Sequence, residues 1–432
     1  MSDIDFDYAF LEGIAQKVGT PFWLYDAEVL RARIAAILEL TSGEGLQARF
    51  AMKACPATKV LKEMRAAGVW IDAVSGNEAL RALHAGYKGG AKPPQILFTS
   101  DVFRDNSLDL VLKEGLLPNA GSPGMLRQLA RAGYRGPLAL RINPGFGHGH
   151  VNACDTGGPS SKHGIWWEDL PAVAAEAERL GLELTMLHAH IGSGPRVEEL
   201  LENLGRLADL YASLLPKYPS VTALSLGGGI PHNYRSPEQA DLAPLKALLE
   251  ASRTKLCDAA GRAIRVEMEP GRYFVAPSCT LVARVTDVKH TQTNEKGQGT
   301  TFAMVDAGFV DLVRPAMYGS YHGIELRSRY VVDIGEGATS DVVVAGPLCE
   351  SGDVFTQGEG EMLAPRQLPT PREGDLVLLR DAGAYGYSMS SNYNSIGRAP
   401  QVWREPNGEL ELISRRETLD DLLKAETSER IK

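Results

Sequence analysis

Eight short apolar segments recur between residues 48 and 271, and their spacing limits the folds open to this chain. They lie at 48–54, 69–75, 95–100, 116–122, 137–144, 184–192, 222–229 and 264–271. Most are separated by Ala-, Leu-, Glu- and Arg-rich stretches with helical spacing, such as TKVLKEMRAAG. Strands that alternate with helices indicate a parallel sheet. Eight such repeats favour a closed (β/α)8 barrel over a doubly wound sheet.

The character of the sequence changes after about residue 277. Four β-like runs follow with turns and little helix between them: CTLVARVTDVKH, TFAMVDAGF, DVVVAGPLC and DLVLLRDAG. The N-terminal residues contain the apolar run PFWLYD, which we assign to the same domain. We therefore expect an α/β chain with a barrel domain at 28–277 and a mostly β, sandwich- or barrel-like domain formed by 1–27 and 278–432. The Gly-rich stretch 143–164 predicts a loop after the fifth strand.

Composition excludes several classes of protein. No apolar run approaches the ~18 residues that a membrane helix needs, and the acidic start MSDIDFDYAF has no secretory pattern. The formal charge of −9 argues against a nucleic-acid surface. Five scattered cysteines without a CxxC pair suit free thiols in a reducing compartment. We expect a cytoplasmic globular protein that binds neither membrane nor nucleic acid.

Polar residues stand at the C-terminal ends of the predicted strands, which is the face where (β/α)8 barrels build their active sites. They are Lys53, Asp72, Ser75, Ser100, Asn119, Arg141, His190, Gly227 to Gly229, and Glu269. Serine and asparagine are common at strand ends in any fold. A lysine, an arginine, a histidine and a glutamate are less so, and they indicate a functional site.

Lys53 lies in the segment ARFAMKACP (48–56), a short apolar run that reads as a buried strand. An isolated ammonium group is expensive to bury. The simplest interpretation is that Lys53 marks the end of the strand and that its amine reaches solvent. The alternative is a lysine held as an imine on an aldehyde cofactor, which buries no bare charge.

Two motifs on the last two strands, LSLGGGI and MEPGRYF, favour the cofactor. Successive glycines let backbone N–H groups approach an anion, and barrels of this kind often hold phosphate after strands seven and eight. By itself the glycine run is equally compatible with a tight turn. A lysine, a phosphate cradle and a strand-end carboxylate at one barrel mouth together indicate pyridoxal 5'-phosphate.

The segment HAHIG places His188 and His190 two residues apart on one predicted strand. An H-x-H pair can bind a metal, but no carboxylate or cysteine pattern accompanies it, and we expect no metal. For His190, stacking on a cofactor ring and a hydrogen-bonded core position are both open. His148 and His150 are interpreted as loop residues.

Longer motifs make the chain similar to the fold-type III pyridoxal-phosphate decarboxylases, and within them to the diaminopimelate decarboxylase family in its gamma-proteobacterial style. The resemblance covers nearly the whole chain. It rests on FAMKAC, DAVSGNE, RINPGFGHGH with TGGPSSKHGIW, HIGSG, GGG, EPGR, VDAGFVDLVRPAMYGSYH, GPLCESGDVF and DAGAYGYSMSSNYNS. The glycine after HIGS and the segment SSNYNSIGRAP depart from the commoner family pattern, at no residue assigned to chemistry.

The resemblance implies a role for each residue that matches the family's pattern. Lys53 would be the Schiff-base lysine, His190 would stack on the cofactor ring, and Glu269 would face the ring nitrogen. The phosphate would be held by Gly227, Gly228, Gly229, Gly271, Arg272 and the hydroxyl of Tyr385. Asp72, Arg141 and Ser193 would support the cofactor and the substrate.

The implied reaction is decarboxylation of meso-2,6-diaminopimelate to L-lysine, the last step of lysine biosynthesis. Cys349 would protonate the α-carbon. The substrate would be bound by Arg272, Arg314, Tyr318, Glu350 and Tyr385. The distal carboxylate of the substrate needs a guanidinium, which Arg314 would provide, and its distal ammonium needs a carboxylate, which Glu350 would provide. The other interpretation of Arg314 is a surface salt bridge. In this family CESGD reaches the neighbouring subunit, which implies a homodimer with shared active sites.

Three rival functions stay open from the sequence. The nearest is a related decarboxylase acting on D-lysine, D-ornithine or a carrier-bound amino acid. The second is an amino-acid racemase on the same barrel, which would hold the ring nitrogen with a weaker acceptor than Glu269. The third is an inactive regulatory homologue, which the joint presence of Lys53, Glu269 and Cys349 disfavours.

Overall fold

The computed structural model describes residues 6–147, 156–192, 196–295, 297–329, 339–358 and 362–428. The chain forms two compact units. The barrel unit comprises Arg31–Asn233 and Glu238–Phe274, and the β unit comprises Met1–Leu30, Tyr234–Pro237 and Val275–Lys432. The domain limits expected from the sequence, 28–277 and 1–27 with 278–432, stay a prediction.

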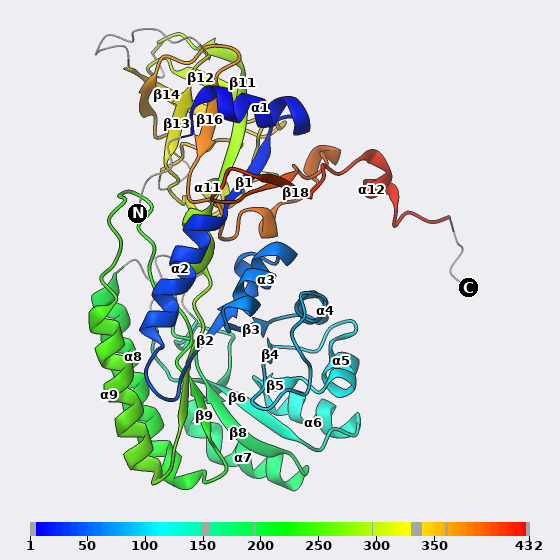
Figure 1. Ribbon diagram of the computed structural model, residues 1–432, viewed down its shortest axis with the longest axis vertical. Helices are drawn as coiled ribbons and strands as arrows, with labels where there is room; N and C mark the ends of the chain where they lie inside the picture. Colours follow the sequence, from blue (N-terminus) through cyan, green and yellow to red (C-terminus); the bar gives the residue numbers. More distant parts are fainter. Residues whose placement is uncertain are drawn as a thin grey trace. The chain divides into compact units, whose positions relative to one another are not determined.

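The barrel unit is built on a closed parallel sheet of eight strands, which confirms the predicted (β/α)8 barrel (Figure 1). The strands are β2 (Leu46–Ala51), β3 (Trp70–Ala73), β4 (Ile96–Ser100), β5 (Leu117–Ala120), β6 (Pro137–Asn143), β8 (Glu183–His188), β9 (Ala223–Ser225) and β10 (Arg265–Met268). Neighbours pair in this order, and β10 returns to pair with β2. A short further strand, β7 (Ile165–Trp166), pairs with β6.

Helices connect successive strands and lie outside the closed sheet (Figure 1). They are α2 (Ala27–Leu40), α3 (Thr58–Ala66), α4 (Gly76–His84), α5 (Ser107–Glu114), α6 (Pro123–Arg131), α7 (Leu170–Arg179), α8 (Val197–Leu214) and α9 (Ala243–Ala260), with α10 (Arg272–Val275) after the last strand. Their starts follow from local sequence. Before α4, Ser75 Oγ accepts from the N–H of Glu78, and Glu78 Oε2 accepts from that of Val74, a reciprocal cap.

Several strands end earlier than the sequence predicted. β2 ends at Ala51, and Lys53 lies in the 3-10 turn Met52–Ala54, so the prediction of Lys53 within the strand is wrong. β8 ends at His188, so His190 also lies beyond its strand. Glu269 directly follows β10. Lys53, His190 and Glu269 thus lie just after their strands. The polar residues Asp72, Ser100, Asn119 and Arg141 instead lie within β3, β4, β5 and β6.

The barrel interior is layered. Strands β4, β5, β6, β8 and β9 contribute an apolar cluster of Leu97, Leu117, Ala139, Met186 and Ala223. Side chains alternate along a strand, so the residue two positions later faces the same interior. Those residues are all polar and buried: Thr99, Asn119, Arg141, His188 and Ser225. A polar layer therefore lies toward the C-terminal strand ends.

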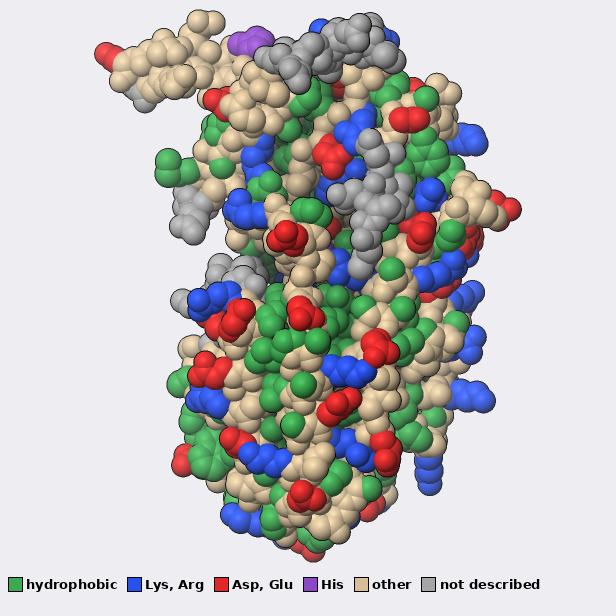
Figure 2. Space-filling view, turned by 60° about the vertical axis from the view of Figure 1, so that its left-hand side comes forward, with side chains coloured by type: hydrophobic (Ala, Val, Ile, Leu, Met, Phe, Trp, Pro, Cys, Tyr) green, Lys and Arg blue, Asp and Glu red, His purple; other side chains and the backbone are tan. Residues whose placement is uncertain are grey.

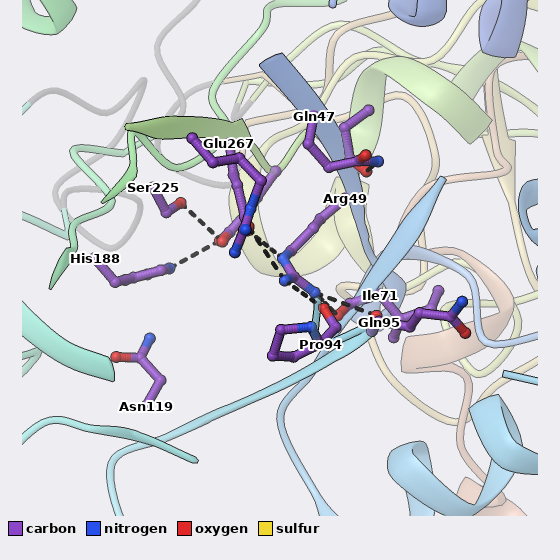
Figure 3. Close-up of polar contacts among 12 residues, drawn as sticks. Gln47, Arg49, Ile71, Pro94, Gln95, Asn119, His188, Ser225 and Glu267 are labelled. Atoms are coloured by element: carbon purple, nitrogen blue, oxygen red, sulfur yellow. Dashed lines mark hydrogen bonds and ion pairs between the residues drawn. The ribbon is translucent and has the colours of Figure 1, made fainter. Parts of the chain in front are cut away.

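A buried ion pair crosses the seam where the last strand meets the first. Arg49 of β2 and Glu267 of β10 have fully buried side chains, and Arg49 Nε donates to Glu267 Oε2. Arg49 also donates to the carbonyls of Ile71 (3.1 Å), Gln95 (3.2 Å) and Pro94 (2.8 Å) (Figure 3). Buried charge is tolerated here because every side of the guanidinium has an acceptor.

The β unit contains a sheet of nine strands within the described residues. They are β1 (Phe22–Asp26), β11 (Cys279–His290), β12 (Thr301–Val305), β13 (Ile324–Arg327), β14 (Thr339–Ala345), β15 (Arg366–Pro369), β16 (Leu376–Leu379), β17 (Gln401–Arg404) and β18 (Leu410–Ser414). β1 pairs with β11 and β17, so the N-terminal run PFWLYD belongs to this sheet. The sheet packs against α1 (Tyr8–Val18) through Leu11 and Ile14. Short helices α11 (Arg314–Tyr318) and α12 (Leu419–Leu423) complete the unit.

Two features of the described residues bear on whether the protein binds membranes or nucleic acids. None of their helices is long and apolar enough to cross a membrane. On the face drawn in Figure 2, acidic and basic side chains are interspersed instead of gathered by sign. Mixed charge of this kind offers no extended basic surface on that face.

Replacing Glu267 by Ala should strongly destabilise the barrel, because it leaves the Arg49 charge buried without its carboxylate. We expect a loss of about 3–5 kcal/mol in the free energy of unfolding, measured with urea. The control is Glu63→Ala, which removes the partly exposed pair Arg31–Glu63 and should cost less than about 1 kcal/mol. Equal losses in the two variants would contradict the assigned role of the seam pair.

Candidate active site

Lys53 stands on the turn that follows β2, with its side chain exposed. The loop after β10 lies beside this turn, because the N–H of Ala51 donates to the carbonyl of Pro270 (3.3 Å). Gly271 permits the contact: a Cβ there would stand 3.2 Å from the carbonyl oxygen of Ala51. The closure of the barrel thus brings the Lys53 turn next to the loop that begins at Glu269.

Glu269 is buried and held through both carboxylate oxygens. His188 Nε2 lies 2.8 Å from Oε2, and Ser225 Oγ donates to Oε1 at 2.8 Å. In Figure 3 a dashed line runs from each of the labelled side chains Ser225 and His188. Burial opposes ionisation, but the charge and hydrogen bond of His188 and the hydrogen bond of Ser225 outweigh it and lower the pKa of Glu269 below its usual value. Glu269 is therefore an anion at neutral pH.

His190 is partly exposed, and the backbone fixes its ring. The N–H of Gly228 donates to His190 Nδ1 at 3.2 Å. Loss of surrounding water, reinforced by the charges of Lys53 and Arg141, lowers the pKa of His190 well below 6.5. The imidazole is therefore neutral, with Nδ1 as the acceptor and the proton on Nε2. A neutral ring with an accessible face suits stacking on an aromatic cofactor.

The glycine run 227–229 packs tightly against the end of β8. Gly227 has a φ of +72°, and a Cβ on it would lie 2.8 Å from His190 Nδ1. Two of the three N–H groups already have partners in the chain, since Gly227 donates to Ser225 Oγ and Gly228 to His190. The glycines are thus required by close backbone approach as well as by any anion that binds here.

Asp72 and Arg141 complete the charged groups of the barrel mouth. Asp72 is buried, and Oδ1 has no hydrogen-bond partner within the described residues. Burial, followed by the charge of Glu269, raises the pKa of Asp72 above its usual value. Burial lowers the pKa of Arg141, opposed by Asp101, Asp72 and Glu269. Arg272 is partly exposed at the start of α10, and Ser193 lies outside the described residues.

These groups fit pyridoxal phosphate. An exposed amine suits the aldehyde, and a neutral imidazole can cover one face of the ring. An ionised carboxylate with spare lone pairs suits a protonated ring nitrogen. Asp72 adds a buried oxygen that is still open to a donor.

In the β unit, Arg314 is buried at the start of α11 and donates to Ser320 Oγ at 3.0 Å. Its guanidinium carbon lies 5.7 Å from the ring centre of Tyr234 and 5.8 Å from that of Tyr385. Burial and these rings disfavour the interpretation of Arg314 as a surface salt bridge. Tyr318 is partly exposed at the end of the same helix.

Tyr385 adopts a φ of 59°. This left-handed region is rare for bulky residues. Strained backbone of this kind costs of order 1–3 kcal/mol and collects at functional sites. The strain supports a functional position for Tyr385.

Cys349 and Glu350 occupy an exposed turn after β14. The N–H of Cys349 donates to Asn394 Oδ1 (3.4 Å), and Tyr393 donates to Glu350 Oε1 (2.7 Å). Asp353 holds the turn in place, because its Oδ2 accepts from the N–H of Leu348 (2.8 Å) and its Oδ1 accepts from the N–H of Phe309 (2.7 Å), which lies between β12 and α11. The aspartate of CESGD is therefore a structural support for the thiol.

Sequence reasoning missed two groups that shape the site. Ser225 was not singled out, and Asp353 was seen only as part of a motif. Ser225 could have been found, because it stands two positions after the inward-facing Ala223. Asp353 could not, since one of its partners is the N–H of Phe309, which belongs to a distant segment of the chain.

A (β/α)8 barrel with an amine, a neutral imidazole and an ionised carboxylate after its strands defines a class of barrel enzymes that act through pyridoxal phosphate. Residues 28–276 match the family model described as "Pyridoxal-dependent decarboxylase, pyridoxal binding domain". The chain belongs to the pyridoxal-dependent decarboxylases, and within them to the diaminopimelate decarboxylase family.

Curated relatives match over nearly the whole chain. Diaminopimelate decarboxylase of Escherichia coli is 41% identical and the match covers 98% of each chain; that of Streptomyces coelicolor is 42% identical, covering 96% of this chain and 91% of the relative. A crystal structure of diaminopimelate decarboxylase matches with a TM-score of 0.87 at 41% identity, covering 96% and 95% of the two chains. Lysine decarboxylase from Selenomonas ruminantium shares the fold, with a TM-score of 0.74 at 19% identity over 93% and 97% of the two chains.

Replacing Asp353 by Ala should loosen the turn that carries Cys349, because the buried N–H of Leu348 and the partly buried N–H of Phe309 lose their acceptor. Leaving a buried N–H unpaired costs about 1–3 kcal/mol. We expect faster alkylation of Cys349 by iodoacetamide, followed by mass spectrometry of the peptide. Asp341→Ala, on the exposed part of β14, is the matched control and should leave the rate unchanged. The same rate in both variants would show that Asp353 does not position the thiol.

Proposed function

We propose that this protein removes carbon dioxide from meso-2,6-diaminopimelate to give L-lysine, with pyridoxal 5'-phosphate as cofactor. The observation that carries the proposal is the barrel mouth, where the Lys53 turn lies beside the loop of an ionised Glu269. Full-length identity of 41–42% with diaminopimelate decarboxylases supports the choice of reaction. In this role the enzyme catalyses the last step of lysine biosynthesis.

The barrel residues would bind and tune the cofactor. Lys53 Nζ would hold its aldehyde carbon, and neutral His190 would cover one ring face without adding charge. Glu269 would keep a proton on the ring nitrogen. The phosphate would be bound by Gly227, Gly228, Gly229, Gly271 and Arg272, together with Tyr385 of the β unit. When bound, pyridoxal phosphate withdraws electrons from the α-carbon of an amino acid.

The bond changes of the reaction are simple. The bond between Cα and the carboxylate breaks, carbon dioxide leaves, and the electron pair stays on Cα. One proton must then reach Cα, and we assign its delivery to the Cys349 thiol, which is exposed. Asp353 supports this assignment by holding the turn on which the thiol stands.

Side chains of the β unit would choose the substrate. A distal carboxylate needs a planar cation, for which we assign Arg314, with Tyr318 of the same unit and Arg272 of the barrel unit in support. Glu350 would take the distal ammonium. A substrate with only an amine at its far end would bring no carboxylate to the buried guanidinium of Arg314.

We further propose a homodimer in which the turn of Cys349 and Glu350 serves the active site of the other protomer. The exposure of this turn is compatible with such a contact. Location in the cytoplasm stays a prediction from the sequence.

The substrate is tested by offering purified protein with pyridoxal phosphate meso-diaminopimelate, D-lysine, D-ornithine and L-ornithine in parallel. We expect carbon dioxide and L-lysine from meso-diaminopimelate alone, because only this compound has both a carboxylate and an ammonium at its far end. Turnover of an ornithine or of D-lysine instead would overturn the substrate and retain the chemistry. Racemised substrate without carbon dioxide would overturn the reaction.

The cofactor link is tested with Lys53→Ala. We expect no cofactor absorbance after desalting and no turnover, since no other exposed amine stands on a strand-end turn beside Glu269 among the described residues. Lys62→Ala, on the exposed face of α3, is the control and should keep both. Retained colour and activity in Lys53→Ala would remove Lys53 from the site.

A further inference from the structure

His188, the first histidine of the H-x-H segment, has no role in the proposed reaction. Its side chain is almost fully buried at the end of β8. Its Nε2 lies 2.8 Å from Glu269 Oε2, and its Nδ1 has no hydrogen-bond partner within the described residues. Leaving one ring nitrogen unpaired in the interior is a cost. The contact between Nε2 and Glu269 must therefore offset the cost of burying an unpaired Nδ1.

Ser225 completes the hold on Glu269. Its Oγ accepts from the N–H of Gly227 (3.1 Å) and donates its single proton to Glu269 Oε1 (2.8 Å). The hydroxyl is therefore oriented by the glycine run, and it cannot turn its proton elsewhere without losing this arrangement. Three neighbouring strands, β8, β9 and β10, fix the direction of the carboxylate.

We propose that His188 is a positioning residue that, together with Ser225, holds Glu269 as an oriented anion facing the ring nitrogen of the cofactor. The inference rests on the role proposed above for Glu269. An anion keeps a proton on the ring nitrogen, whereas a neutral carboxylic acid would keep its own proton and donate a hydrogen bond to a ring nitrogen that carries none. His188 would then act on the reaction without touching cofactor or substrate.

The charges around Glu269 show why such a residue is needed. The groups that act on it are Arg49, Arg141, His188, His190, Asp72, Tyr211 and Ser225. Asp72 is a second buried acid close by, and it and burial both disfavour charge on Glu269. His188 is the largest opposing influence. It pushes the pKa of Glu269 down, while burial and the charge of Glu269 keep the pKa of Asp72 raised, so the pKa values of two neighbouring acids move apart.

The test measures the protonation of the ring nitrogen directly by nitrogen NMR. The sample is holoenzyme reconstituted with pyridoxal phosphate that is labelled at the ring nitrogen, and spectra are recorded from mildly acid to mildly alkaline pH. In the native protein we expect a protonated ring throughout. In His188→Leu the ring should lose its proton as the pH rises, and kcat should fall about tenfold for each pKa unit lost, with KM nearly unchanged. In His188→Gln, which keeps an uncharged N–H donor, the ring protonation and the kcat should lie between those of the native protein and those of His188→Leu.

Two further variants make the outcomes distinct. His163→Gln alters another histidine beside a carboxylate, with Nδ1 2.7 Å from Asp101 Oδ2, and should leave the ring nitrogen protonated. Glu269→Gln should change the ring signal. If it does while both His188 variants match the native protein, His188 is only structural and the inference is overturned. If Glu269→Gln also leaves the signal unchanged, the role of Glu269 itself fails, and the inference fails with it.

Discussion

The ion pair between Arg49 and Glu267 is the contact on which the site depends. It crosses the seam between the first and last strands, whose register pairs Glu267 with Gln47. A slip of one residue would turn every side chain of β10 to the other face. Since Glu269 stands two residues after Glu267, the pair that closes the barrel also aims the carboxylate of the site. Closure likewise sets the Lys53 turn against the loop after β10.

Polar side chains inside a barrel need an apolar layer beneath them, here called the floor, and partners for their charges. The apolar cluster on β4 to β9 supplies the floor. Above it, Asn119 donates to Thr99 Oγ1 (3.1 Å), and His188 and Ser225 take the two oxygens of Glu269. Because Thr99, Asn119, His188 and Ser225 each stand two positions beyond an apolar residue of the floor, alternation along their strands produces both layers. The low polarity of the floor strengthens every interaction in the layer above it.

The sequence alone predicted the barrel, its eight strands and the residues at their ends, because apolar periodicity and strand-end chemistry are local. It failed where geometry is set by distant partners. Lys53 was placed in a strand, yet the backbone leaves the sheet at Ala51 to meet the loop of Pro270. The hydrogen bond from the N–H of Gly228 to His190 could not be predicted from the sequence either, since it depends on how closely two strand ends approach.

The proposed roles fall mostly on different units of the chain. The residues assigned to the cofactor ring lie after barrel strands, whereas Arg314 and Glu350, assigned to the far end of the substrate, belong to the β unit. The fold is shared with a lysine decarboxylase at 19% identity, so architecture alone does not select the substrate. Selection must then lie in single side chains. A buried guanidinium is a costly group to retain, and a substrate that brings a carboxylate to it gives the chain a physical reason to keep Arg314.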